Sequence, residues 1–165
     1  GMYSWNHLAG EAMEQYGADR LTVPVELNER EIRDSGIHGE MIVYGYLPMM
    51  ISAQCIRKTT LGCSGKPEIM WLKDRKEMRF PVVNQCRFCY NTIYNSAPLS
   101  LLGLSASVEE LGPKALRLNF TVEEPAAAGE ILDAFFEEYA LGEKAAETSV
   151  LKNQFTRGHF KRGVE

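Results

Sequence analysis

Four cysteines placed around two strand-like segments constrain this chain more than any other feature of its sequence. Cys55 and Cys63 are separated by seven residues, and Cys86 and Cys89 by two. Between the two pairs, residues 69–83 hold two runs of β-type residues with a charged turn between them, which predicts a β-hairpin. Because one pair precedes the hairpin and the other follows it, closing the hairpin brings the four cysteines toward each other.

The spacing of these cysteines is typical of a metal site. A metal held by thiolates takes its ligands from at least two segments, usually with one close pair on a tight turn. The C-x2-C at Cys86 and Cys89 supplies the close pair, and Cys55 and Cys63 come from a second segment. We therefore predict a four-cysteine metal or cluster site, for which zinc and an iron–sulfur cluster fit the ligand set equally well. One or two disulfides, or buried free thiols, are the alternatives.

Composition limits the class of protein. With 165 residues, of which 45% are hydrophobic and 24% charged, the chain is expected to form a single domain spanning residues 1–165. No apolar run reaches the roughly 20 residues that span a bilayer, so a cytoplasmic location without membrane contact is expected, where reduced thiols favour metal binding. The 18 basic and 22 acidic residues leave a net charge of −4, so any nucleic-acid contact would have to be local.

The order of the predicted elements indicates an α/β fold. Residues 4–16 have the apolar spacing of a helix, and residues 21–25 are predicted to form a strand. Residues 28–36 are predicted to form one or two helical turns capped by Asn28. Residues 39–50 are apolar on both faces, which predicts one buried parallel strand. A cysteine-bearing hairpin region, about 51–95, interrupts this rhythm. The later elements are a short helix at 107–112 capped by Ser107, a strand at 114–122, a long helix at 124–143 and a polar surface tail at about 148–165.

Other candidate site residues give weaker signals. Glu26 ends a predicted buried strand, where α/β proteins place functional groups, although a carboxylate at the start of a helix beside Asn28 explains it equally well. His7, His38 and His159 lie in unrelated segments without a partner at ligand spacing, which favours exposed or structural roles. The closing "FTRGHFKRG" mixes basic and aromatic residues and could contact a nucleic acid, whereas a solvated tail is the simpler interpretation.

Several segments together resemble a known family. "LTVPVELNEREI", "VYGYLPMMISAQC", "LKDRKEMRFPVVNQC", "YNTIYNS" and "FTRGHFKRG" are similar to the C-terminal half of the collagenase-like peptidase family U-32, and the resemblance covers most of the chain. It implies the late strands of a (β/α)8-type barrel, with the cysteine hairpin inserted before the final strand and helix. Since such a barrel needs ~250 residues, we expect a partial (β/α) barrel-like half that begins near the fifth or sixth strand.

The resemblance also implies a function. Better-studied relatives insert oxygen into, or hydroxylate, RNA bases or quinone precursors, and several hold a four-iron four-sulfur cluster on four cysteines. By resemblance, Cys55, Cys63 and Cys86 match the first three of these, and Cys89 is taken as the fourth. Arg117 matches a basic residue of the family's final strand and is, with Glu26, a candidate catalytic residue. The implied substrate of the parent protein is an RNA or a small aromatic molecule.

Two other functions stay open at this point. The family name implies a collagenase-like protease, yet the sequence has no nucleophile–base pair, no paired catalytic carboxylates and no zinc-protease helix. The other is a non-catalytic module in which zinc staples an α/β half to a second copy or to the missing half-barrel, because half a barrel leaves open strand edges. The resemblance implies that the full-length family member is an enzyme, a peptidase or a hydroxylation factor, and this chain alone is expected to be inactive.

Overall fold

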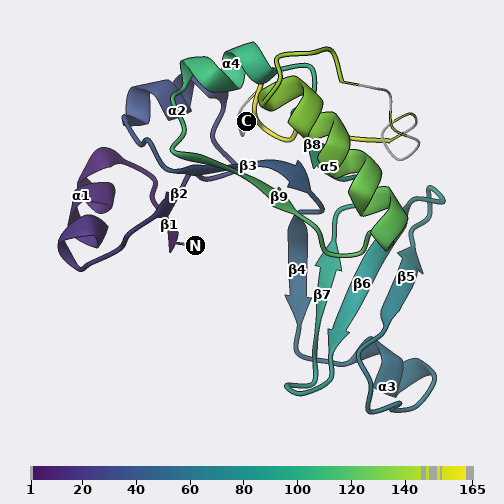
Figure 1. Ribbon diagram of the computed structural model, residues 1–165. Helices are drawn as coiled ribbons and strands as arrows, with labels where there is room; N and C mark the ends of the chain where they lie inside the picture. The colour runs from purple at the N-terminus through teal and green to yellow at the C-terminus, as the bar shows by residue number, and fades with distance from the viewer. Residues whose placement is uncertain (1, 146–147, 149–151, 153, 163–165) are drawn as a thin grey trace.

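Two β-sheets contain all the strands of the described residues, and the core lies between the first sheet and the helices (Figure 1). The computed structural model describes residues 2–145, 148, 152 and 154–162. In the first sheet four strands run parallel, in chain order, and a fifth pairs antiparallel with the end of the central strand. The parallel strands are β1 (Met2–Tyr3), β2 (Leu21–Thr22), β3 (Glu40–Gly45) and β9 (Ala115–Asn119), and the antiparallel one is β8 (Leu99–Ser100).

The second sheet extends away from the first and is called the arm, residues 48–94 (Figure 1). It is antiparallel, in the order β4-β7-β6-β5, and the short helix α3 (Ile56–Thr60) lies at its far end. The predicted hairpin is confirmed, because β5 and β6 pair in antiparallel register along five residue pairs. Its strands are β4 (Pro48–Ser52), β5 (Ile69–Lys73), β6 (Arg79–Gln85) and β7 (Tyr90–Tyr94).

Four further helices belong to the first sheet: α1 (His7–Gln15), α2 (Glu29–Ser35), α4 (Ser105–Glu110) and α5 (Pro125–Tyr139). The helix α2 begins with a capping box, in which Asn28 Oδ1 accepts from the Glu31 amide and the Glu31 carboxylate accepts from the Asn28 amide. In α5, Pro125 starts the helix, and Ile131, Ala134, Phe135 and Glu138 are buried along one face. No helix of the described residues is both long and apolar enough to span a bilayer.

The single long strand predicted at 39–50 is wrong. The chain leaves the first sheet at Gly45, and Pro48 starts β4 in the second sheet. Gly45 has φ +141°, and a Cβ there would collide with the backbone of Asn119 on β9, so the residue that ends β3 has to be glycine. A continuous apolar run concealed this break because both flanking strands are apolar.

Helix starts also differ from the sequence-based expectation. Helical spacing was predicted from residue 4, but α1 begins at His7, and the side chain of Asn6 caps it by accepting from the Ala9 amide at 2.9 Å. Ser4 is instead buried beside β2. The helix α4 begins after Leu104, so Ser107 lies inside it rather than at its N-cap.

The continuous described segment of the predicted tail, residues 154–162, is not a solvated tail. Phe160 is 4% exposed and belongs to the core of the first sheet. Thr156 bonds through its backbone to Pro98 and Ser100, on either side of Leu99. Arg157 donates to the carbonyl oxygens of Ser100 and Leu102. Arg157 and Phe160, two of the residues that the sequence suggested for nucleic-acid contact, are thus engaged within the fold.

The observed fold is therefore mixed α/β, as predicted. The finer expectation of half a barrel is not confirmed, because the described strands form no closed barrel: β1 and β9 are the two ends of an open sheet. Consecutive parallel strands nevertheless lie side by side in chain order, without the reversal that marks a doubly wound sheet.

Candidate functional sites

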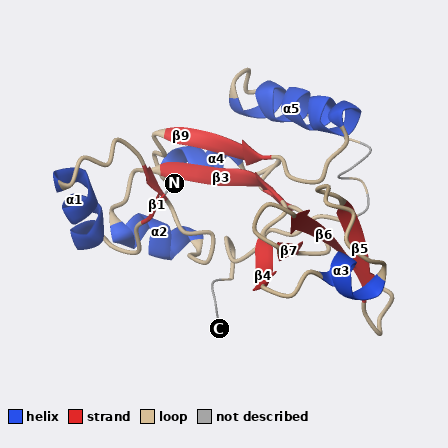
Figure 2. Cartoon of the chain, turned by 90° about the horizontal axis from the view of Figure 1, so that it is seen from below, coloured by secondary structure: helices blue, strands red, loops and turns tan. Residues whose placement is uncertain are grey.

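The four cysteines lie at the far end of the arm. Cys55 immediately precedes α3, Cys63 follows it, and Cys86 and Cys89 begin and end the turn between β6 and β7. Figures 1 and 2 both show α3 beside the end of the arm's sheet. The hairpin thus brings together two cysteine segments that are distant in sequence.

Two buried asparagines position the loops that carry the first pair. Asn84 on β6 and Asn91 on β7 are register partners and are almost completely buried. The Asn91 side chain donates to the carbonyl of Gln54, the residue before Cys55, at 2.7 Å, and the Asn84 side chain accepts from the Glu68 amide. Burial in a sheet fixes these rotamers, so the loop around α3 is tied to the strands at both of its ends.

The turn that carries the second pair is tight. The Phe88 amide donates to the Gln85 carbonyl at 3.0 Å, and Cys89 adopts φ +53°, a left-handed conformation that closes the hairpin. The Cys86 thiol donates to the Lys66 carbonyl at 2.9 Å. This bond places Cys86 against the segment that follows Cys63.

The surroundings of Cys86 raise the pKa of its thiol. Desolvation raises this pKa above its ordinary value, and negative charge on Cys63, Cys55, Cys89 and Glu68 raises it further. A bound cation would offset this repulsion and favour the thiolate form of Cys86.

The donor set fits a thiolate-bound metal in kind. All four cysteines are free thiols; Cys55 and Cys86 are partly buried, and Cys63 and Cys89 are exposed. In the described residues no three His, Cys, Asp or Glu side chains are grouped tightly enough to hold an ion as they stand. Binding would thus need the thiols to turn inward from their present hydrogen bonds, such as the one from Cys86 to Lys66.

A second polar group lies on the first sheet. Arg117 on β9 forms an ion pair with Glu40 on β3, whose side chain is 8% exposed, and Arg20 lies 3.8 Å from the same carboxylate. Glu26 follows β2 and has a buried Oε2 without a hydrogen-bond partner among the described residues. Burial and the Glu26 charge raise the pKa of Tyr3, while Arg117 lowers it, so both predicted residues lie near this phenol.

Sequence reasoning missed the centre of this group. Tyr3, Thr22 and Glu40 are successive register partners across β1, β2 and β3, so their side chains share one face of the sheet. The available signal was Glu40 itself, a single acidic residue opening the otherwise apolar strand "EMIVYG". Pairing with buried Glu40 gives Arg117 a structural role that is sufficient to explain it.

The histidines are consistent with a structural interpretation where the contacts are clear. His38 Nδ1 lies 3.3 Å from the carbonyl oxygens of Leu111 and Gly112, at the end of α4. His7 is exposed on the first turn of α1. Neither lies beside the cysteines.

Comparison with known proteins adds no assignment. No family model matches the chain, and neither a curated protein nor a solved structure matches it. The function has to be inferred from the residues and their arrangement.

Proposed function

We propose that this chain is part of an iron–sulfur-dependent factor, similar to members of peptidase family U-32, that hydroxylates RNA bases or a small aromatic substrate. The observation that carries the proposal is that both cysteine segments lie at the same end of the arm, where the Cys86 thiol donates to the Lys66 carbonyl in the segment that follows Cys63. Thiolates from two segments, with one pair on a tight turn, are a ligand set for a [4Fe–4S] cluster. Cys55, Cys63, Cys86 and Cys89 would hold it.

Such a cluster supplies electron transfer, or substrate activation when one iron keeps an open position. The protein's own contribution is to hold the ligand loops in place. The buried Asn84 and Asn91 do this, and so does the ion pair between Arg57 Nε and Glu68 Oε2 at 3.0 Å across the base of the α3 loop.

Anaerobic reconstitution with iron and sulfide tests the proposal. We expect a brown protein with a broad visible absorbance band and acid-labile sulfide, because thiolate-bound iron–sulfur clusters absorb in this range. The control is the same protein alkylated at its thiols before reconstitution, which should stay colourless. A colourless product with stoichiometric zinc bound by the unmodified protein would instead support the zinc-stapled module.

We propose, second, that the parallel sheet is half of a (β/α) barrel. Its support is the chain-order pairing of β1, β2, β3 and β9, since right-handed crossovers between such strands place the helices on one face. Both end strands also leave an edge unpaired among the described residues. Beside β9 an apolar groove opens against α5, lined by Val43, Leu116, Leu118, Leu132, Phe135, Phe136, Tyr139 and Ala140.

This second proposal predicts self-association of the purified chain. Leu132 and Phe136 on α5 are 52% and 58% exposed, and an apolar face of this kind beside an open strand edge favours contact with another half-barrel. We expect light scattering after size-exclusion chromatography to give a dimer or larger species, and Phe136→Glu to shift it toward monomer. Leu61→Glu, at an exposed apolar residue on the arm, is the matched control. A monomeric wild-type chain would contradict the half-barrel.

A further inference from the structure

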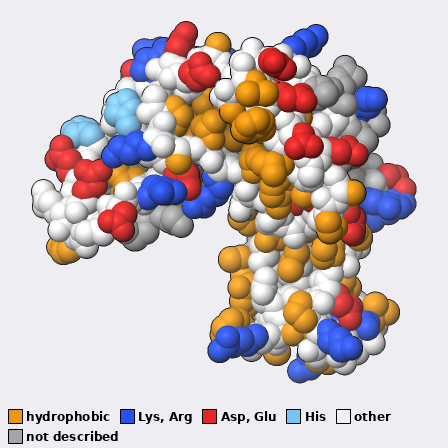
Figure 3. All heavy atoms as spheres, viewed as in Figure 1, with side chains coloured by type: hydrophobic (Ala, Val, Ile, Leu, Met, Phe, Trp, Pro, Cys, Tyr) orange, Lys and Arg blue, Asp and Glu red, His pale blue; other side chains and the backbone are white. Residues whose placement is uncertain are grey.

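The cysteine end of the arm is basic although the chain is acidic. The segments that carry the cysteines, residues 53–68 and 85–90, contain four basic residues and the single acid Glu68, while the whole chain has a net charge of −4. Figure 3 shows blue basic side chains gathered at the lower end of the arm. The four are Arg57, Lys58, Lys66 and Arg87.

Three of these four cations are free to bind a ligand. Arg57 is paired with Glu68. Lys58, Lys66 and Arg87 are exposed, and within the described residues none of them forms an ion pair. Lys58 lies on α3, Lys66 is held against Cys86 by its carbonyl, and Arg87 follows Cys86. A local positive surface thus surrounds the cysteines.

An aromatic platform stands on the same turn. Phe88 is 67% exposed, whereas phenylalanine side chains are usually buried in folded proteins. Its ring stacks on Tyr90 with centroids 6.3 Å apart and planes 24° from parallel, and the Arg87 guanidinium lies 5.3 Å from its centroid. These contacts hold the Phe88 ring in place before any ligand binds, with the Arg87 guanidinium beside it.

We propose that this end of the arm binds single-stranded RNA, with Phe88 as a base-stacking platform and Lys58, Lys66 and Arg87 as phosphate contacts. Exposed aromatic rings flanked by cations are the recurring means of holding unpaired bases, because stacking needs a free base face and the backbone needs positive charge. The inference rests on the proposed function: it assigns RNA, rather than a small molecule, as the substrate and presents the base beside the four cysteines.

Fluorescence anisotropy with a short labelled single-stranded RNA of mixed sequence tests this surface. Phe88→Ala should raise Kd by about 10-fold, because one stacking contact is lost, whereas Phe88→Tyr keeps a π-face and should retain most of the affinity. Arg87→Ala and Lys58→Ala should each remove one phosphate contact, which reduces the slope of log Kd against the logarithm of the salt concentration by about 0.7. The matched controls, Trp71→Ala and Arg75→Ala, alter an exposed aromatic ring and an exposed cation of the arm away from the cysteines, and should bind like wild type.

The outcomes separate this inference from the proposed function. Equal Kd values for wild type and Phe88→Ala, equal affinity for single-stranded and duplex RNA, or binding to anionic vesicles without binding to RNA would each overturn it. A reconstituted cluster without RNA binding would contradict this surface alone. Phe88-dependent RNA binding by a chain that never assembles a cluster would support the surface and contradict the iron–sulfur proposal alone.

Discussion

Replacing Cys86 with serine is expected to abolish cluster assembly. Cys86 begins the tight turn between β6 and β7, and its thiol donates to the Lys66 carbonyl in the segment that follows Cys63. A serine hydroxyl keeps the size of the side chain but is not deprotonated at neutral pH and does not replace a thiolate as a ligand of iron. Iron and sulfide contents after anaerobic reconstitution, with the visible absorbance, measure the loss. Far-UV circular dichroism checks that the fold is retained.

Each of the other cysteines provides a comparison. Cys55→Ser, Cys63→Ser and Cys89→Ser should also reduce iron content, and a variant that keeps the full amount identifies a cysteine that is not a ligand. Cys89 is the most informative, because its left-handed backbone gives it a turn-forming role besides that of a ligand. If Cys86→Ser bound as much iron as wild type, the four-cysteine site would be wrong.

The Cys86 thiol is expected to make cluster assembly depend on pH. Because desolvation and neighbouring negative charge raise the pKa of Cys86, its thiol is protonated in the metal-free protein at neutral pH. Metal binding has to release that proton, so assembly becomes more favourable as pH rises from about 7 to about 9. The initial rate and final yield of cluster formation across this range measure the effect, and a yield that falls with rising pH would contradict it.

Local pattern predicted the parts of the fold that local interactions determine. The hairpin predicted over residues 69–83 begins with β5 at Ile69–Lys73, and the helix predicted at 124–143 is α5, which spans Pro125–Tyr139. Both have strong periodicity and charged or proline-marked boundaries. The capping box at Asn28 likewise follows from residues three positions apart.

Features determined by distant contacts were not accessible from one sequence. The break at Gly45 depends on how closely Asn119 of β9 approaches it, and the two-residue strands β1, β2 and β8 exist only through pairing with β3 or its neighbour. At the sites, the placement of both cysteine segments at one end of the arm followed from the hairpin. The pairing of Arg117 with Glu40 joins strands separated by the whole arm, so no spacing rule could reveal it.

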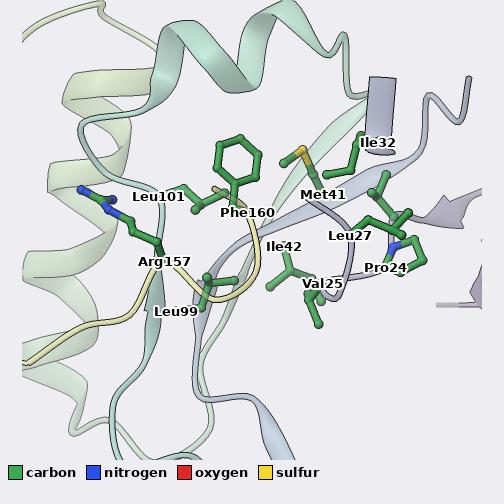
Figure 4. A pocket seen from close by; sticks show the side chains of 11 residues that line it. Pro24, Val25, Leu27, Ile32, Met41, Ile42, Leu99, Leu101, Arg157 and Phe160 are labelled. Carbon is green, nitrogen blue, oxygen red and sulfur yellow. The ribbon is translucent and has the colours of Figure 1, made fainter. Parts of the chain in front are cut away.

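Phe160→Ala is expected to produce the largest loss of stability among single changes in the C-terminal segment. The ring is 4% exposed and packs in the core beside β3 and β8, and Figure 4 shows it near Leu101 and Met41. Removing a buried phenylalanine ring removes its transfer free energy and leaves a cavity, which together cost about 3–5 kcal/mol. Urea unfolding followed by circular dichroism measures the free energy of unfolding.

Phe155→Ala is the matched control within the same segment. Phe155 is 43% exposed and its ring lies 4.7 Å from the Arg157 guanidinium, so its removal should cost no more than about 1 kcal/mol. The difference between the two variants distinguishes a packed segment from a surface tail. Equal, small effects would mean that residues 154–162 do not hold the core together. A large effect of Phe160→Ala alone would mean that this polar segment is part of the domain because its one buried ring packs in the core. The hydrogen bonds from Arg157 to the carbonyl oxygens of Ser100 and Leu102 hold the segment in the same place.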